Sequence, residues 1–201
     1  MKILALETSS AAGSIAVLDG DRLLAERRFS SPRGRGAEIF AALEELRGLW
    51  TGAERVSVGL GPGSYNGLRT ACALAGSFRT ALGVGLTGLP SVCALDVAQD
   101  DYTVCGDARG GRVFWARIRA RRLAGEIELP AVADLPELWP RESVPVYRLG
   151  AVHGAEHLPE ARPDAVILAR LAAREPAGTP DHLEPLYLKP PHITQPRSVV
   201  A

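Results

Sequence analysis

The residues best suited to bind a ligand lie in one stretch, GLGPGSYNGLR, which spans Gly59–Arg69. It places four glycines and a proline within nine residues, between an apolar run and a helical pattern. Glycine lets the backbone approach a ligand closely, and free N–H groups at the start of a helix attract anions. The stretch therefore has the composition of a loop that binds phosphate.

This glycine-rich stretch does not match the established glycine motifs. A Walker A loop needs a lysine after its last glycine, where Leu68 stands, and the dinucleotide fingerprint needs a glycine at Asn66. A nucleophile elbow at Ser64 would need glycines in place of Pro62 and Asn66. One interpretation is a tight turn that lets a helix pack closely on a sheet. The other is a phosphate loop built on Gly61, Gly63 and Ser64.

A carboxylate and three hydroxyls follow the first apolar run of the chain, at Glu7, Thr8, Ser9 and Ser10. A carboxylate at the end of a first strand, followed by hydroxyls in a hairpin, could hold a magnesium ion together with phosphate. The alternative is ordinary turn chemistry from the three hydroxyl residues.

The stretch HGAEH, at residues 153–157, has the H-x-x-E-H spacing that can bind zinc when both histidines share one face of a helix. Gly154 and Pro159 predict a loop here instead, and no third ligand is evident. We therefore expect no metal site at His153, Glu156 and His157.

Cationic side chains alternate in the stretch GDARGGRVFWARIRARR. Asp107 and Arg109 stand at a predicted strand-to-turn junction. The arginines that follow share one face of a strand, and they are Arg117, Arg119 and Arg121. That face is either a solvated edge or a surface for a partner or for tRNA.

The composition is that of an ordinary soluble globular protein, with 46% hydrophobic and 23% charged residues. Lys+Arg and Asp+Glu both number 23, and this zero net charge argues against strong nucleic-acid binding by the chain alone. The three cysteines, Cys72, Cys93 and Cys105, are too widely spaced for a zinc ribbon and fit a reducing cytosol. No apolar run has the length of a signal peptide or a membrane span, so we expect a cytoplasmic protein.

The elements that must position these residues follow from the hydrophobic pattern. Short apolar runs bounded by turn residues predict strands over 2–8, 13–19, 22–29, 55–60 and 84–89. Helical spacing covers 37–50, 67–83 and a segment that begins near Pro90. The first hundred residues thus read β-β-β-α-β-α-β-α, with three antiparallel strands before a parallel βαβ part.

The second half of the chain opens in the same way and predicts a degenerate second copy with fewer or shorter helices. Strands are predicted over 102–108, 112–121, 126–129 and 144–152, and a helix over 164–174. The predicted domains are therefore 1–100 and 101–188. The remaining tail, 189–201, has three prolines, and we expect it to be extended or disordered.

Three stretches together resemble the TsaB (YeaZ) family, the small subunit of the bacterial machinery that makes threonylcarbamoyladenosine (t6A) in tRNA. They read ILALETSSAAGSIAVLDGDRLLAE, GLGPGSYNGLR and GDARGGRVF. The G-P-G-S-[YF]-T-G-L-R block is specific to that family, and here Asn66 replaces the usual threonine. The resemblance covers essentially the whole chain. It implies two ribonuclease-H-like α/β domains of the actin, sugar-kinase and Hsp70-like superfold.

The resemblance also implies a function. In that superfold the first hairpin and a second glycine loop face the phosphates, so Glu7–Ser10 and Gly61–Ser64 would be vestigial phosphate loops. The catalytic relative, TsaD, carries metal-binding histidines in an insertion, whereas no histidine lies between Gly67 and Val104 here. The implied protein is a non-catalytic scaffold that needs no cofactor itself. It would bind TsaD as a heterodimer and act with the ATPase TsaE, the nucleotide and metal ion belonging to those partners and tRNA binding through the complex.

The predicted helix 67–83 is the first candidate for the partner interface, because its small residues would let another helix approach closely. The interface residues that we expect are Arg69, Ala71, Cys72, Ala75, Gly76 and Arg79. The helix over 37–49 is the second candidate, and a self-complementary surface would also allow a homodimer. The rival functions are a nucleotide phosphotransferase or ATPase that uses Glu7 and the glycine loop, and a metallopeptidase at residues 153–157.

Overall fold

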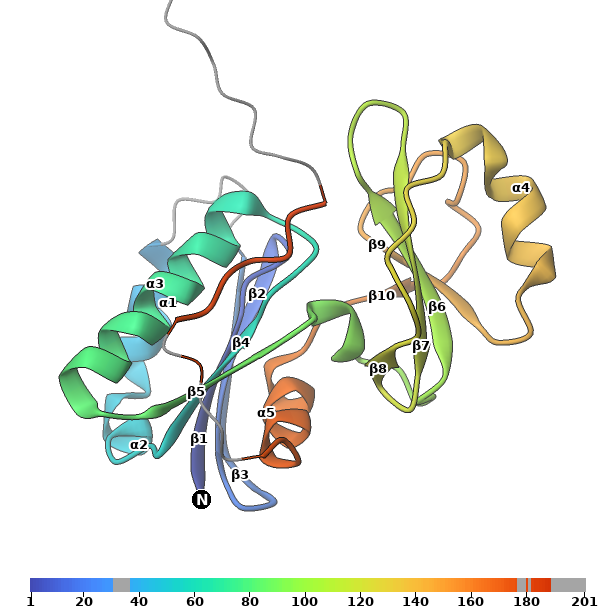
Figure 1. Ribbon diagram of the computed structural model, residues 1–201. Helices are drawn as coiled ribbons and strands as arrows, with labels where there is room; N and C mark the ends of the chain where they lie inside the picture. The colour runs from blue at the N-terminus through green and yellow to red at the C-terminus, as the bar shows by residue number, and fades with distance from the viewer. Residues whose placement is uncertain (31–36, 177–179, 181, 189–201) are drawn as a thin grey trace, which may run out of the picture.

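The chain forms two five-stranded sheets (Figure 1). The computed structural model describes residues 1–30, 37–176, 180 and 182–188, and the predicted tail 189–201 lies outside them. The strand order is β3-β2-β1-β4-β5 in the first sheet and β10-β9-β6-β7-β8 in the second. The predicted architecture of two α/β domains is confirmed.

The first sheet follows the predicted topology. Its strands are β1 (Lys2–Glu7), β2 (Ala12–Asp19), β3 (Arg22–Ser30), β4 (Arg55–Gly59) and β5 (Gly85–Leu89). The first three strands are antiparallel, and β4 and β5 continue the sheet parallel to β1.

Helices cover both faces of the first sheet. The helices are α1 (Ala37–Glu45), α2 (Arg47–Trp50), α3 (Tyr65–Leu82) and α5 (Ala165–Ala173). Since side chains alternate along a strand, Leu4 and Leu6 of β1 pack against α1 and α3, whereas Ile3 and Ala5 pack against α5. This sandwich fixes the ends of β1 and β4, where both predicted phosphate loops begin.

The second sheet is smaller and carries less helix. Its strands are β6 (Tyr102–Asp107), β7 (Val113–Arg119), β8 (Arg122–Leu123), β9 (Val146–Leu149) and β10 (Glu160–Ala161). The short α4 (Leu135–Leu138) packs on one face, flanked by the 3-10 turns η2 (Val132–Asp134) and η3 (Trp139–Arg141). Residues 126–129, predicted as a strand, take part only in an isolated bridge between Glu128 and Trp115.

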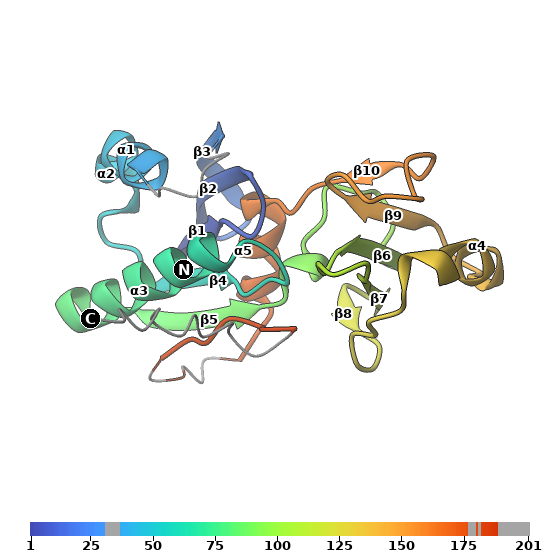
Figure 2. The same cartoon turned by 90° about the horizontal axis from the view of Figure 1, so that it is seen from above.

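Helix α5 connects the two cores. It lies in the stretch that we assigned to the second domain, yet Ala165, Leu168 and Ala169 pack on the first sheet. Figure 2 shows it on the side of the first sheet that faces the second. Its Leu171 also contacts the second core, around Val104.

The prediction of a helix that begins near Pro90 is wrong. Only one 3-10 turn forms there, η1 (Ser91–Cys93), and the chain then crosses to the second sheet. The segment that leads to the second sheet pairs with the segment that returns from it, since Leu95 and Pro163 form an isolated β-bridge. Tertiary pairing of these two connectors therefore replaces the local helix. Among the described helices, none combines the length and apolar character needed to cross a membrane.

Candidate functional site

The two predicted phosphate loops lie side by side because they follow neighbouring parallel strands. β1 ends at Glu7 and β4 at Gly59, and Leu6 pairs with Val58 just before these ends. The carboxyl ends of parallel strands meet at one edge of a sheet, where α/β proteins bind ligands. The two stretches, which the family resemblance assigns to one phosphate-facing site, thus lie at the same edge of the sheet.

The glycine loop is closed against the backbone that follows β1. A Cβ atom on Gly63 would lie 2.0 Å from the carbonyl oxygen of Ser9, and one on Gly67 would lie 2.1 Å from that of Thr8. Neither position has room for a side chain, so both require glycine. Carbonyl oxygens next to the loop repel a phosphate group rather than bind it.

Three backbone N–H groups of the loop and the helix start already donate to protein oxygens. The N–H of Ser64 donates to the carbonyl of Ser9 at 2.6 Å, and that of Gly61 to Ser91 Oγ at 3.0 Å. The N–H of Gly67 donates to Ser64 Oγ at 3.3 Å, which caps the start of α3. This geometry favours the tight-turn interpretation of the loop.

The hydroxyl groups of Thr8 and Ser10, which follow β1, also donate to backbone carbonyls. Thr8 Oγ1 donates to the carbonyl of Gly67 at 2.8 Å, and Ser10 Oγ donates to that of Ala12 at 2.9 Å. The hydroxyl of Ser9 is buried and has no hydrogen-bond partner among the described residues. Two of the three candidate hydroxyl groups therefore already donate to backbone carbonyls.

Glu7 is fully buried, next to Gly59. Its Oε1 accepts a hydrogen bond from the N–H of Ser9 at 2.7 Å, whereas Oε2 has no partner among the described residues. Burial raises the pKa of this carboxyl, and the hydrogen bond from the N–H of Ser9 offsets only part of that rise. A buried carboxyl that holds its proton more tightly is a poor ligand for a cation and is out of reach of an external substrate.

Two of the predicted interface residues on α3 are placed differently from our prediction. Ala71 and Ala75 are 0% exposed and belong to the core between α3 and the first sheet. They are small because the helix packs closely on the strands, so they cannot touch a partner.

The four other predicted interface residues lie on one side of α3, which we call the α3 flank: Arg69, Cys72, Gly76 and Arg79. Arg69 is exposed and the other three are partly exposed. A Cβ atom on Gly76 would meet no atom within 4 Å, so this part of the flank is open. The flank begins next to Tyr65, whose hydroxyl accepts a hydrogen bond from Arg69 at 2.6 Å.

The alternating arginines do not form a free basic surface. Arg117 pairs with Glu142 at 2.8 Å and with Glu128. Arg119 donates to the carbonyl of Ile118 at 2.8 Å.

Arg121 points inward instead of towards a partner or tRNA. Its side chain is 9% exposed, and it donates to the carbonyls of Leu95 at 2.7 Å and Val97 at 2.5 Å. The guanidinium also lies over the ring of Tyr102. It therefore holds the connector between the two sheets, and the interpretation of Arg121 as a tRNA or partner contact is wrong.

The remaining motif residues lie in turns of the second sheet. Asp107 accepts a hydrogen bond from the N–H of Arg109 at 2.8 Å, which fixes the predicted turn between β6 and β7. The side chain of His153 is 92% exposed, and the ring of His157 packs against Trp139. Within the part of the chain that the structure describes, no three His, Cys, Asp or Glu side chains are grouped so that they could hold a metal ion.

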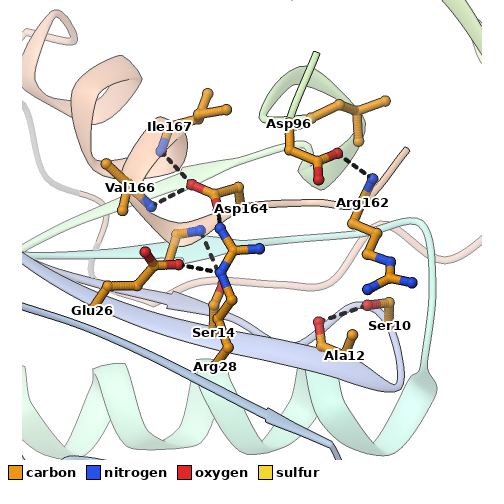
Figure 3. Close-up of polar contacts among 12 residues, drawn as sticks. Ser10, Ala12, Ser14, Glu26, Arg28, Asp96, Arg162, Asp164, Val166 and Ile167 are labelled. Carbon is orange, nitrogen blue, oxygen red and sulfur yellow. Dashed lines mark hydrogen bonds and ion pairs between the residues drawn. The ribbon is translucent and has the colours of Figure 1, made fainter. Parts of the chain in front are cut away.

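Sequence reasoning missed a polar junction at the start of α5 (Figure 3). Asp164 Oδ1 accepts hydrogen bonds from the N–H groups of Val166 and Ile167, at 2.9 and 3.0 Å, and Oδ2 pairs with Arg28 at 2.5 Å. An aspartate directly before an apolar run is a recognisable N-cap signal. The pairing with Arg28 has no such signal, because the two residues are 136 positions apart.

Two further contacts tie α5 to the first sheet. Ser14 Oγ accepts a hydrogen bond from the N–H of Ala165 at 3.0 Å, and the buried Arg55 donates to the carbonyl of Ala172 at 2.7 Å. These partners lie 151 and 117 residues apart in sequence. Both ends of α5 are thereby fixed to strands of the first sheet.

Relatives of the chain are found among mycobacterial proteins. No protein-family model matches it. The uncharacterized protein Rv3421c of Mycobacterium tuberculosis (strain ATCC 25618 / H37Rv) is 32% identical over 208 residues, which cover 94% of this chain and 92% of that protein. The uncharacterized protein ML0378 of Mycobacterium leprae (strain TN) is also 32% identical, over 94% of this chain, but the chain spans only 55% of its length.

Solved structures from Pseudomonas aeruginosa show the same fold. YeaZ superimposes with a TM-score of 0.66 and 23% identity, over 93% of this chain and 99% of that one. An uncharacterized protein with similarity to peptidase YeaZ gives a TM-score of 0.74 at 23% identity, over 94% and 99%. The chain therefore belongs to the same family as these mycobacterial proteins, and it has the fold of YeaZ that its TsaB (YeaZ) resemblance predicted.

Proposed function

We propose that this chain is a non-catalytic, cytoplasmic scaffold subunit of the bacterial complex that makes threonylcarbamoyladenosine in tRNA. It would bind and support TsaD together with the ATPase TsaE. The closed glycine loop carries this proposal. Its N–H groups at Gly61, Ser64 and Gly67 already have acceptors, and carbonyl oxygens of Thr8 and Ser9 lie against it. Nucleotide and metal ion would then belong to the partners.

The distribution of exposed apolar side chains supports a partner on the first domain. Large apolar side chains that are markedly exposed, among the described residues, are Met1, Leu23, Phe40, Leu49, Tyr65, Leu82 and Tyr187. None of these belongs to the second sheet, and four of them lie on α1, α2 and α3. Contiguous exposed apolar patches mark the surfaces where proteins bind one another, and these side chains are the candidates for such a patch. We therefore propose the helices of the first domain, and the α3 flank in particular, as the TsaD contact.

An assay of nucleotide binding distinguishes the proposed scaffold from the rival phosphotransferase or ATPase. We expect the isolated chain to bind no ATP in equilibrium dialysis and to release no phosphate. Tight ATP binding with turnover that disappears in Glu7→Gln would overturn the proposal, because the scaffold has no need of that carboxylate.

Co-elution with TsaD tests the docking surface. Gly76→Glu places a charged side chain on the open part of the α3 flank, and we expect the affinity for TsaD to fall more than about tenfold. Gly48→Glu is the matched comparison, since Gly48 on α2 is also a helical glycine whose Cβ would meet nothing within 4 Å, and a larger loss in the Gly76 variant assigns the contact to the α3 flank and not to α2. Wild-type affinity in the Gly76 variant would exclude the flank as the contact. A wild-type chain that does not bind TsaD would exclude the scaffold role.

A further inference from the structure

The chain after α5 returns to the first domain and runs beside α3, as Figure 1 shows in red. We call residues 182–188 the C-terminal strap. Leu183 packs against the core formed by the first sheet and α3. The N–H of Leu186 donates to the carbonyl of Leu60 at 2.8 Å.

The binding site of Leu183 depends on a glycine and is loosely packed. A Cβ atom on Gly88 would lie 3.0 Å from Leu183 and 2.6 Å from Leu60, so this position of β5 leaves room for both leucines. A cavity of about 370 Å³ adjoins them, with Leu86 in its wall. A side chain beside such a cavity has fewer packing contacts to lose when it withdraws.

The end of the strap covers the N-terminal half of the α3 flank. The ring of Tyr187 lies 5.4 Å from that of Tyr65, and the guanidinium of Arg69 lies over the Tyr65 ring. Because Arg69 and Cys72 stand four and seven residues after Tyr65, all three lie on the same side of α3. Further along the helix, the Cβ position of Gly76 is open. Among the described residues, the strap thus lies beside the N-terminal half of the flank and leaves the Cβ position of Gly76 open.

We propose that the C-terminal strap is a displaceable cover of the α3 flank, and that TsaD and the strap compete for the half that Tyr187 occupies. This inference rests on the proposed function. A partner that docks along the whole flank has to move Tyr187 aside, which frees Tyr65 and Cys72 for contact. The entropy that the strap regains on release is opposed by its contacts, which are those of Leu183, Leu186 and Tyr187 with the first domain and that of Leu188 with the second core.

Native-state labelling of Cys72 tests the cover without any partner. Of the three cysteines, Cys93 and Cys105 are buried and only Cys72 is partly exposed, so a thiol reagent reports on the flank. We expect Leu183→Ala to label about tenfold faster than wild type, because truncation of this partly buried leucine removes apolar contacts that hold the strap closed. Leu23→Ala is the matched control, as this leucine on β3 is 42% exposed and remote from the flank in sequence.

If Cys72 in a folded Leu183→Ala chain is labelled at the wild-type rate, the proposal that the strap covers the α3 flank is wrong. If circular dichroism shows that this variant unfolds, Tyr187→Ala replaces it, because Tyr187 is 45% exposed and outside the core. Loss of its ring contact should speed the labelling of Cys72 about threefold. Wild-type labelling in that variant would also overturn the cover.

The affinity for TsaD tests the competition. Leu183→Ala should bind TsaD more tightly than wild type and Leu23→Ala, by about the factor found in labelling. Equal or weaker binding by the Leu183 variant would overturn the competition while leaving the scaffold role standing. If even the wild-type chain does not bind TsaD, the proposed function fails and the competition fails with it, whereas labelling still reports the strap separately.

Discussion

Gly63 and Gly76 are the same residue type in opposite surroundings. The Cβ position of Gly63 lies 2.0 Å from a carbonyl oxygen, and that of Gly76 has no neighbour within 4 Å. We expect Gly63→Ala to lower the free energy of unfolding by about 1–3 kcal/mol, because backbone must shift to admit the methyl group. Gly76→Ala is the control and should raise it by about 0.5–1 kcal/mol, since alanine favours a helix interior. Urea unfolding measures both, and equal midpoints would contradict the closed loop.

Glu7 makes the stability of the folded chain depend on pH, and the direction of this dependence follows from its raised pKa. Its pKa is raised in the folded chain, so the folded state keeps a proton that the unfolded state releases. The stability associated with this group is complete below the unfolded value of 4.5 and is lost as the pH rises through the raised pKa.

Glu7→Gln should therefore unfold at a higher urea concentration than wild type at neutral pH, and the difference should shrink as the pH falls towards 4. Urea midpoints at several pH values measure this. A variant that is less stable than wild type at pH 7 would show that the carboxylate is charged and paired in solution.

The sequence could predict where the residues of the candidate site lie more reliably than what they contact. Glu7 and Gly63 were assigned to one site by the family resemblance, and the structure shows that both follow parallel strands. Ala71 and Ala75 were misassigned because small residues suit a close contact with a strand as well as with a partner helix. Only the fold shows which side of α3 meets the sheet.

At the scale of elements, α5 depends on a single side chain at its start. Asp164 caps the helix with one oxygen and pairs with Arg28 through the other. We expect Asp164→Ala to lower the free energy of unfolding by about 1–2 kcal/mol, as for other lost N-caps. Asp164→Asn keeps a capping oxygen without the charge and should retain most of the stability. Thermal unfolding compares the two, and equal losses would show that the ion pair outweighs the cap.

The elements that the sequence predicted well are those whose pattern is local. β1 to β5 and α3 were recognised from alternation and helical spacing. The segment after Pro90 was not, because Leu95 pairs with Pro163, a residue 68 positions later that no local pattern reveals. The same limit applies to the binding of Arg28 by Asp164.

At the scale of the whole molecule, Arg121 links the second sheet to the connector. Its guanidinium binds two carbonyls, of Leu95 and Val97, and also Asp100. A lysine ammonium cannot reproduce this forked geometry. Arg121→Lys should lower the free energy of unfolding by about 1–3 kcal/mol, since buried carbonyls lose their donors.

Arg122→Lys is the control for Arg121, because its side chain is 69% exposed and, among the described residues, pairs with Glu175. We expect a change below about 0.5 kcal/mol there. Tryptophan fluorescence follows both, since Trp50 reports on the first domain and Trp115 on the second. Equal effects of the two variants would contradict the connector contact.

The bridge between Leu95 and Pro163 has a consequence for how such a chain can evolve. The chain passes from the first domain to the second sheet at Leu95 and returns at Pro163, and these two residues pair with each other. Helix α5, which packs on the first sheet, forms only after this return. Insertions with neighbouring ends are the kind that a fold tolerates best. The second sheet can therefore be lengthened, trimmed or exchanged without cutting the strands that carry the glycine loop and α3.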